Sequence, residues 1–245
     1  MGLDAATLAA VAALGACAAV VGAVGGFGTG VIIAACLSPF IGVKAVVPVM
    51  AVAGIIINSG RFWFYRGDFD RRACGLLLLG ALPGLVVGTW IYSVLDARAV
   101  GTLLGTVVIA TVPARRWLHR HKIVVGAPAL VAGSGAYGLS AGVAPGTGMI
   151  QISLLMGAGL AGPAVLGTDA LATILIDVCK ATLFQRYSLL DEQAVVLGLV
   201  LGAASVPGSG AGAWLVRRMH AHLHTILMEG LIVFGGAFML YQAWK

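Results

Sequence analysis

The chain has 245 residues, of which 60% are hydrophobic and only 10% are charged, and its formal net charge is +6. A soluble domain carries about 25% charged residues, so this composition excludes an ordinary soluble protein and favours an integral membrane protein. The positive charge does not indicate nucleic-acid binding, because the basic residues gather in short loops, where they set membrane orientation. The four cysteines lack CxxC spacing, and we expect neither a metal site nor a cofactor.

Eight apolar segments follow one another along the chain, and we expect each to be helical in an all-α membrane protein. They cover residues 5–40, 43–65, 73–95, 99–114, 123–157, 163–187, 193–216 and 223–243. Most approach the roughly 20 residues that a membrane-spanning helix needs, and segment 99–114 is shorter. Segments 5–40 and 123–157 are too long, because a helix of some 35 residues would extend about 50 Å against a hydrocarbon core of about 30 Å.

Glycine-rich stretches predict where the two long segments break or re-enter the membrane. They read GAVGGFGTG at residues 22–30 and SAGVAPGTG at residues 140–148. Glycine tolerates unusual backbone angles, and Pro145 removes a donor and disfavours helix at the residue before it. Non-helical backbone at membrane depth occurs only where it is buried in protein or lines a wet cavity. Two such breaks therefore predict a site.

Collinear matches between the two halves indicate an internal repeat. At an offset of 118 residues Gly28-Thr29-Gly30 coincides with Gly146-Thr147-Gly148, and at 124 Pro83-Gly84 coincides with Pro207-Gly208. Slowly growing offsets are expected after a duplication followed by small insertions, whereas chance similarity between glycine-rich segments is the alternative. We expect two homologous four-segment repeats, residues 1–118 and 119–245, in a single membrane domain.

The breaks are our candidate binding site for an anion. Helix N-termini expose unpaired N–H groups and the positive end of the helix dipole, and together these bind anions. The candidate residues are Gly26, Gly28, Thr29, Gly30, Gly146, Thr147 and Gly148. The alternative is that these small residues only allow helices to pack closely.

Ionisable residues inside apolar segments are the second group of candidates, because such residues are costly in a membrane and usually functional. Segment 163–187 contains Asp169, Asp177 and Lys180. Asp177 and Lys180 have the i,i+3 spacing of a direct pair, so a structural ion pair is one interpretation. In the other, Lys180 attracts the anion while Asp169 or Asp177 takes up a proton. Asn58 and Arg61 are further candidates in the first half, and we expect the Arg61 cation to lie near Lys180.

Charge counts do not decide the topology. If all eight segments cross, nine basic residues share one side and four the other; the nine are Arg66, Arg71, Arg72, Arg115, Arg116, Arg120, Lys122, Arg186 and Lys245. If segments one and five are re-entrant hairpins, the halves are inverted, and Arg217 and Arg218 replace Arg186 and Lys245 in the set of nine. The positive-inside rule makes the larger set cytoplasmic, so the termini are inside in the first arrangement and outside in the second.

The sequence resembles the TauE/SafE sulfite exporters, a family of four-plus-four transmembrane anion permeases. The resemblance rests on GAVGGFGTGVI and its second-half counterpart, on YRGDFD at 65–70, and on VLGTDALATILIDVCK at 165–180. It implies transport of sulfite, a sulfonate or a related sulfur-containing anion.

We therefore expect a multi-pass secondary transporter of the bacterial inner membrane, working by alternating access around a midplane site. Its partners would be a small anion, the lipid bilayer and protons as a candidate coupling ion. The alternative is an anion channel or a non-transporting membrane partner of an enzyme complex. Enzyme activity is not expected, because no nucleophile–base pair emerges.

Overall fold

The computed structural model describes residues 5–25, 29–120, 125–216 and 221–244, and all the regular structure in these ranges is α-helical. Its ten helices are α1 (Ala5–Gly25), α2 (Thr29–Ile41), α3 (Val43–Tyr65), α4 (Arg71–Val94), α5 (Ala97–Arg120), α6 (Ala127–Val143), α7 (Gly148–Gly157), α8 (Pro163–Arg186), α9 (Glu192–Val216) and α10 (Ala221–Trp244). Each of the two long apolar segments contains two helices, α1 and α2 in the first and α6 and α7 in the second.

Most helix bounds lie within two residues of the apolar segments, and those of α3 coincide with segment 43–65. The bounds expected for the fourth segment, 99–114, are wrong, because α5 continues to Arg120. Residues 115–120 read RRWLHR, and these side chains lower the hydropathy without being poor helix formers. The apolar segment predicted from hydropathy therefore ends before the helix does. The boundary expected between the repeats, after residue 118, falls in the last turn of α5.

The surface of the molecule carries large apolar side chains. Within the described residues, α3 and α4 are long and apolar enough to cross a bilayer by length and composition. Leu79, Val86 and Val87 on α4 are exposed, as are Val233 and Phe234 on α10. Exposed apolar patches of this kind are rare on soluble monomers and mark contact with lipid or another protein.

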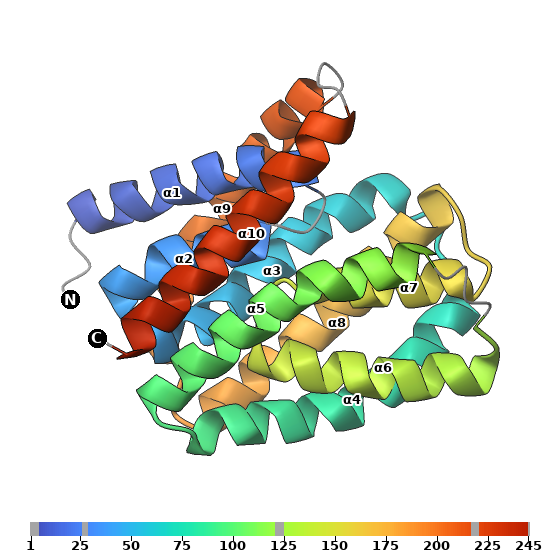
Figure 1. Cartoon of the computed structure of the whole chain (residues 1–245), viewed down its shortest axis with the longest axis horizontal. Helices are drawn as coiled ribbons and strands as arrows, with labels where there is room; N and C mark the ends of the chain where they lie inside the picture. The colour runs from blue at the N-terminus through green and yellow to red at the C-terminus, as the bar shows by residue number, and fades with distance from the viewer. Residues whose placement is uncertain (1–4, 26–28, 121–124, 217–220, 245) are drawn as a thin grey trace.

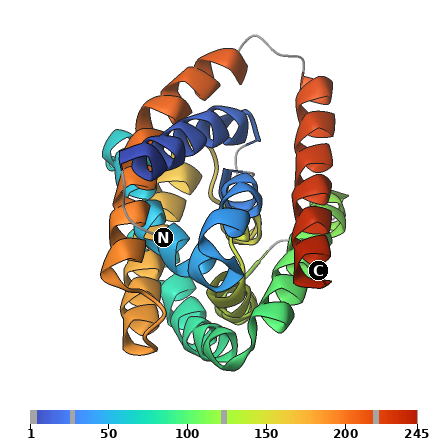
Figure 2. The same cartoon turned by 90° about the vertical axis from the view of Figure 1, so that its left-hand side faces the viewer.

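Most helices run roughly along the longest axis of the molecule, and the first turn of α1 and the last turn of α10 lie at the same end (Figure 1). The most extensive helix packing joins the two halves of the sequence: α4 with α6, α1 with α9, α3 with α8, and α5 with α10. Viewed from that end, α2 lies inside the bundle, between α8 and α9 on one side and α5 and α10 on the other (Figure 2). The halves are therefore intertwined.

Among the described residues, buried apolar side chains form three clusters, and each combines both halves. The first cluster comes from α1, α2, α3 and α9 and includes Val11, Leu37, Val49 and Leu201. The second comes from α4, α6, α7 and α8 and includes Leu77, Tyr137, Leu155 and Ile176. A third cluster, around Tyr92 and Phe184, lies where these two groups of helices meet α5 and α10.

Small residues allow α4 and α6 to approach closely. A Cβ added at Gly80, Gly84 or Gly88 of α4 would overlap the backbone carbonyl oxygens of Val131, Gly135 and Leu139 of α6. In a bilayer the lipid tails are as apolar as the helix surfaces, so the hydrophobic effect does not drive helices together. Van der Waals packing of this kind drives their association instead. The glycine spacing of four residues places all three on one face of α4.

We predict that Gly84→Ala destabilises the protein, because the added methyl group must push α4 and α6 apart. Overpacking costs about 1–3 kcal/mol, which lowers the melting temperature of a protein of this size by roughly 2–10 °C. Gly75→Ala on the same helix is the matched control, since nothing lies within 4 Å of a Cβ there. Equal melting temperatures for the two variants in detergent would contradict this packing.

Candidate functional site

The break between α6 and α7 follows directly from its sequence. Ala144, the residue before Pro145, has an extended backbone with φ −141° and ψ 145°, as the proline ring requires. Gly146 has φ +84°, in the left-handed region that favours glycine. The helix therefore ends at Val143 and starts again at Gly148.

The two glycine-rich stretches lie against one another. A Cβ built on Gly30 would lie 3.3 Å from the backbone nitrogen of Gly146 and 3.6 Å from the Cβ of Pro145. Gly30 is the second residue of α2, and Gly146 comes two residues before α7 begins. The starts of α2 and α7 thus lie close together, although 118 residues separate Gly30 from Gly148. Gly26 and Gly28 lie outside the described residues, as does the side chain of Thr29.

The start of α7 combines a buried hydroxyl with open space. Thr147 is the N-cap residue of α7, is 3% exposed, and makes no capping hydrogen bond with its side chain. A Cβ added at Gly148 would meet no atom of the described residues within 4 Å. Among these residues there is thus room for a larger side chain at the start of α7.

Arg61 of α3 and Asp169 of α8 form an ion pair between the two helices. The Arg61 Nη2 lies 2.9 Å from the Asp169 Oδ2, and the Arg61 Nη1 donates to the Asn58 Oδ1 at 3.0 Å. Asn58 in turn donates from its Nδ2 to the carbonyl oxygen of Gly54 at 2.9 Å. The Asp169 side chain is 4% exposed, whereas the Arg61 side chain is 35% exposed. Arg61 is thus the accessible member of the pair.

Gln151 connects this ion pair to the break in the second half. It is fully buried on the first turn of α7 and donates from its Nε2 to the backbone oxygen of Asp169 at 3.2 Å. Its Oε1 accepts from the Thr173 hydroxyl at 3.4 Å. Gln151 is not among the site residues predicted from the sequence, although a polar side chain in an apolar segment is itself a signal of function.

The other ion pair lies within α8. The Lys180 Nζ is 2.9 Å from the Asp177 Oδ1, with 10% and 8% of the two side chains exposed, so the direct pairing predicted from the spacing is confirmed. The backbone of Gly54 in α3 approaches the Asp177 carboxylate so closely that a Cβ would overlap it. This pair is neutral as a unit and closed from solvent.

The structure does not bring Arg61 and Lys180 to one place. Arg61 contacts Asp169, which lies eleven residues before Lys180 on α8, a distance of about 16 Å along the helix at 1.5 Å per residue. Asn58 and Arg61 coincide with Asp177 and Lys180 at an offset of 119 residues. Arg61 and Lys180, which match one another at this offset, therefore lie towards opposite ends of the packed helices α3 and α8.

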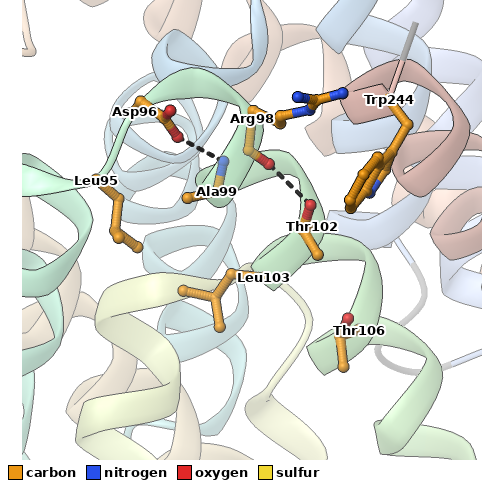
Figure 3. Close-up of a pocket in the computed structure, with 8 residues that line it drawn as sticks. All are labelled: Leu95, Asp96, Arg98, Ala99, Thr102, Leu103, Thr106 and Trp244. Atoms are coloured by element: carbon orange, nitrogen blue, oxygen red, sulfur yellow. Dashed lines mark hydrogen bonds between the residues drawn. The ribbon is translucent and has the colours of Figure 1, made fainter.

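An open groove of about 520 Å³ lies away from these residues, at the start of α5 and the end of α10 (Figure 3). The Arg98 guanidinium lies 4.5 Å from the centre of the Trp244 ring. Asp96 accepts a hydrogen bond from the Ala99 N–H at 2.7 Å and so caps α5. Tryptophan and arginine at helix ends are typical of the membrane–water interface, and none of the candidate residues lines this groove.

One of the comparisons with known proteins identifies a family. The family model for the sulfite exporter TauE/SafE matches residues 11–239 of the chain. No curated protein and no solved structure shows significant similarity to it.

We predict that Lys180→Met strongly destabilises the protein, because it leaves the buried Asp177 carboxylate without its cation. Breaking a buried pair in this way costs about 3–5 kcal/mol, whereas replacing both partners is often nearly neutral. The double variant Asp177→Asn/Lys180→Met should therefore recover most of the melting temperature measured in detergent. If Lys180→Met melts like the unmodified protein, the pair is not structural, and a role for Lys180 in anion binding is favoured instead.

Proposed function

We propose that this chain, which belongs to the sulfite exporter TauE/SafE family, is a secondary transporter of a small sulfur-containing anion such as sulfite. The family is one of membrane transporters; the anion, its site and the mechanism are our proposal. The observation that carries it is the contact of Gly30 with Pro145 and Gly146. The starts of α2 and α7, one from each half, meet there, and this arrangement supports a site like that of transporters whose substrate lies between discontinuous helices.

The chemistry of this meeting point suits an anion. The starts of α2 and α7 each bring backbone N–H groups and a positive dipole end to the region. Thr147 adds a buried hydroxyl, and the space beside Gly148 is open. Thr29 occupies the equivalent position at the start of α2. Helix N-termini of this kind bind anions through their free N–H groups.

The helix packing supports an arrangement of two inverted repeats. If α1 corresponds to α6 and α4 to α9, the packing of α4 on α6 and of α9 on α1 is the same contact made twice. The pairs α3 with α8 and α5 with α10 then each join equivalent helices. A symmetric pattern of this kind is expected from a duplication and not from chance similarity.

Re-entrant hairpins agree with the contacts at the helix ends. The Val125 N–H, just before α6, donates to the carbonyl oxygen of Gly157 at the end of α7 at 2.7 Å. The chain thus returns after α7 to the end at which α6 begins. In this arrangement the nine basic residues that include Arg217 and Arg218 face the cytoplasm of a bacterial inner membrane, and both termini lie outside.

We predict that one sulfur anion raises the melting temperature of the detergent-purified protein. Ligand at about 100 times its dissociation constant stabilises by about 2.7 kcal/mol, or roughly 5–10 °C for a protein of this size. The panel is sulfite, thiosulfate, sulfate, methanesulfonate and acetate. A folded protein that responds to none of these anions would contradict the proposal.

Two variants test where the anion binds. Thr147→Val removes a hydroxyl from the break, and Gly148→Leu fills the space beside α7; both should fold normally and lose most of the anion-induced shift. Thr182→Val, at an exposed position of α8, is the control and should keep the whole shift. If the anion stabilises the Thr147→Val and Gly148→Leu variants as much as the unmodified protein, the anion binds elsewhere.

Uptake into proteoliposomes distinguishes a transporter from a channel. Uptake that does not saturate and does not depend on a proton gradient would favour a channel.

A further inference from the structure

We propose that the transported anion competes with the Asp169 carboxylate for Arg61, so that each anion bound at Arg61 is accompanied by one proton taken up by Asp169. This inference rests on the proposed function, since it requires an anion that binds. It assigns Arg61 to substrate binding and distinguishes Asp169 from Asp177 as the proton carrier.

The exposures of the two partners set the direction of the exchange. The Arg61 side chain is 35% exposed and an anion can reach it, whereas the Asp169 side chain is 4% exposed and lies behind it. The guanidinium carries five donors in a planar fork, and Asn58 holds one edge of it through the Nη1. An incoming anion can therefore take the donors that now serve Asp169 while Asn58 keeps the fork in place.

Asp169 has no other described source of positive charge. Within the described residues, Arg61 provides the one hydrogen bond that its carboxylate accepts, at 2.9 Å. Gln151 contacts only the backbone oxygen of Asp169 and is neutral. Once an anion occupies Arg61, the Asp169 carboxylate is buried without a partner.

The titratable and charged groups around Asp169 do not replace Arg61. Tyr137 of α6 interacts with Asp169, and its phenol carries no positive charge in either protonation state. The Asp70 carboxylate, beside Thr168, accepts from the Ala73 N–H and caps α4. On α8 itself, Asp177 and Lys180 neutralise one another. A buried charge without a partner is costly and is avoided by neutralisation, so Asp169 takes up a proton.

The exchange balances in atoms and charge. Before it, the Arg61 guanidinium is paired with the Asp169 carboxylate. Afterwards it is paired with the anion, and a proton from solvent is bound to a carboxylate oxygen of Asp169, forming a neutral carboxyl group. No covalent bond other than this O–H bond forms or breaks, and the site gains no net charge when the anion carries a single negative charge.

Calorimetric titration of the purified protein tests the exchange. The probe is methanesulfonate or thiosulfate, whichever stabilises the protein, because both remain ionised between pH 5.5 and 8 and contribute no protons. In buffers of different ionisation enthalpy we expect about one proton taken up per anion bound. Because a proton is then bound together with the anion, the affinity should rise up to tenfold for each unit by which the pH falls. This holds over the pH range in which Asp169 is ionised in the free protein and protonated in the anion-bound protein.

Asp169→Asn provides the second arm, since its neutral amide mimics the protonated acid. We expect this variant to bind the anion without proton uptake, with an affinity that no longer depends on pH and equals the best affinity of the unmodified protein. Asp68→Asn, at an exposed loop position, is the matched control and should keep the normal pH dependence.

The outcomes separate the two proposals. Failure of the unmodified protein to bind any anion of the panel overturns the proposed function. Binding without proton uptake, or a pH dependence that persists in Asp169→Asn, overturns the exchange while the proposed function stands. If Asp169→Asn does not fold, the proton count measured on the unmodified protein still decides.

Discussion

The structure depends on one constraint: backbone that leaves a helix inside a membrane must be buried against protein or wet space. This chain has one glycine-rich stretch before α2 and another between α6 and α7, and Gly30 lies against Pro145 and Gly146. A side chain at Gly30 would be only 3.3 Å from the Gly146 nitrogen, so its absence lets the starts of α2 and α7 come together. The two helices, one from each half of the sequence, therefore begin in the same part of the molecule.

Close contact between small residues extends this arrangement to the rest of the bundle. Gly80, Gly84 and Gly88 let the backbone of α4 contact that of α6, and Gly208 does the same where α9 approaches Ala16 of α1. Long side chains at these positions would hold the four helices apart. The two halves of the sequence can therefore intertwine, and α2 and α7 can begin deep inside the molecule.

Much of the fold could be predicted from the sequence, because hydropathy and helix breakers act locally. Pro145 and Gly146 produce the break where their backbone preferences require it, and the spacing of Asp177 and Lys180 predicted their pair. Contacts between helices could not be predicted in this way. Arg61 and Asp169 are 108 residues apart, and no periodicity within a helix links them. Gln151 was missed because its equivalent at an offset of 118 is the apolar Ile33, so the repeat did not mark it.

Core packing also bears on which parts of the molecule can move. The halves of the sequence cannot separate as rigid bodies, because all three buried clusters contain helices from both halves. Two of the clusters define mixed groups of helices, α1, α2, α3 and α9 in one and α4, α6, α7 and α8 in the other. These two groups pack on one another through α3 and α8. Each contains one broken segment, and the contact of Gly30 with Gly146 joins them.

The Arg61–Asp169 pair crosses the same boundary, from α3 to α8, whereas the Asp177–Lys180 pair lies wholly within one group. An ion pair across this boundary helps to hold the two groups together. A pair inside one group has no such effect, whatever its strength. The exchange that we propose would remove this contact between the groups when an anion binds, and a contact that differs between the free and bound states is what a movement linked to binding requires.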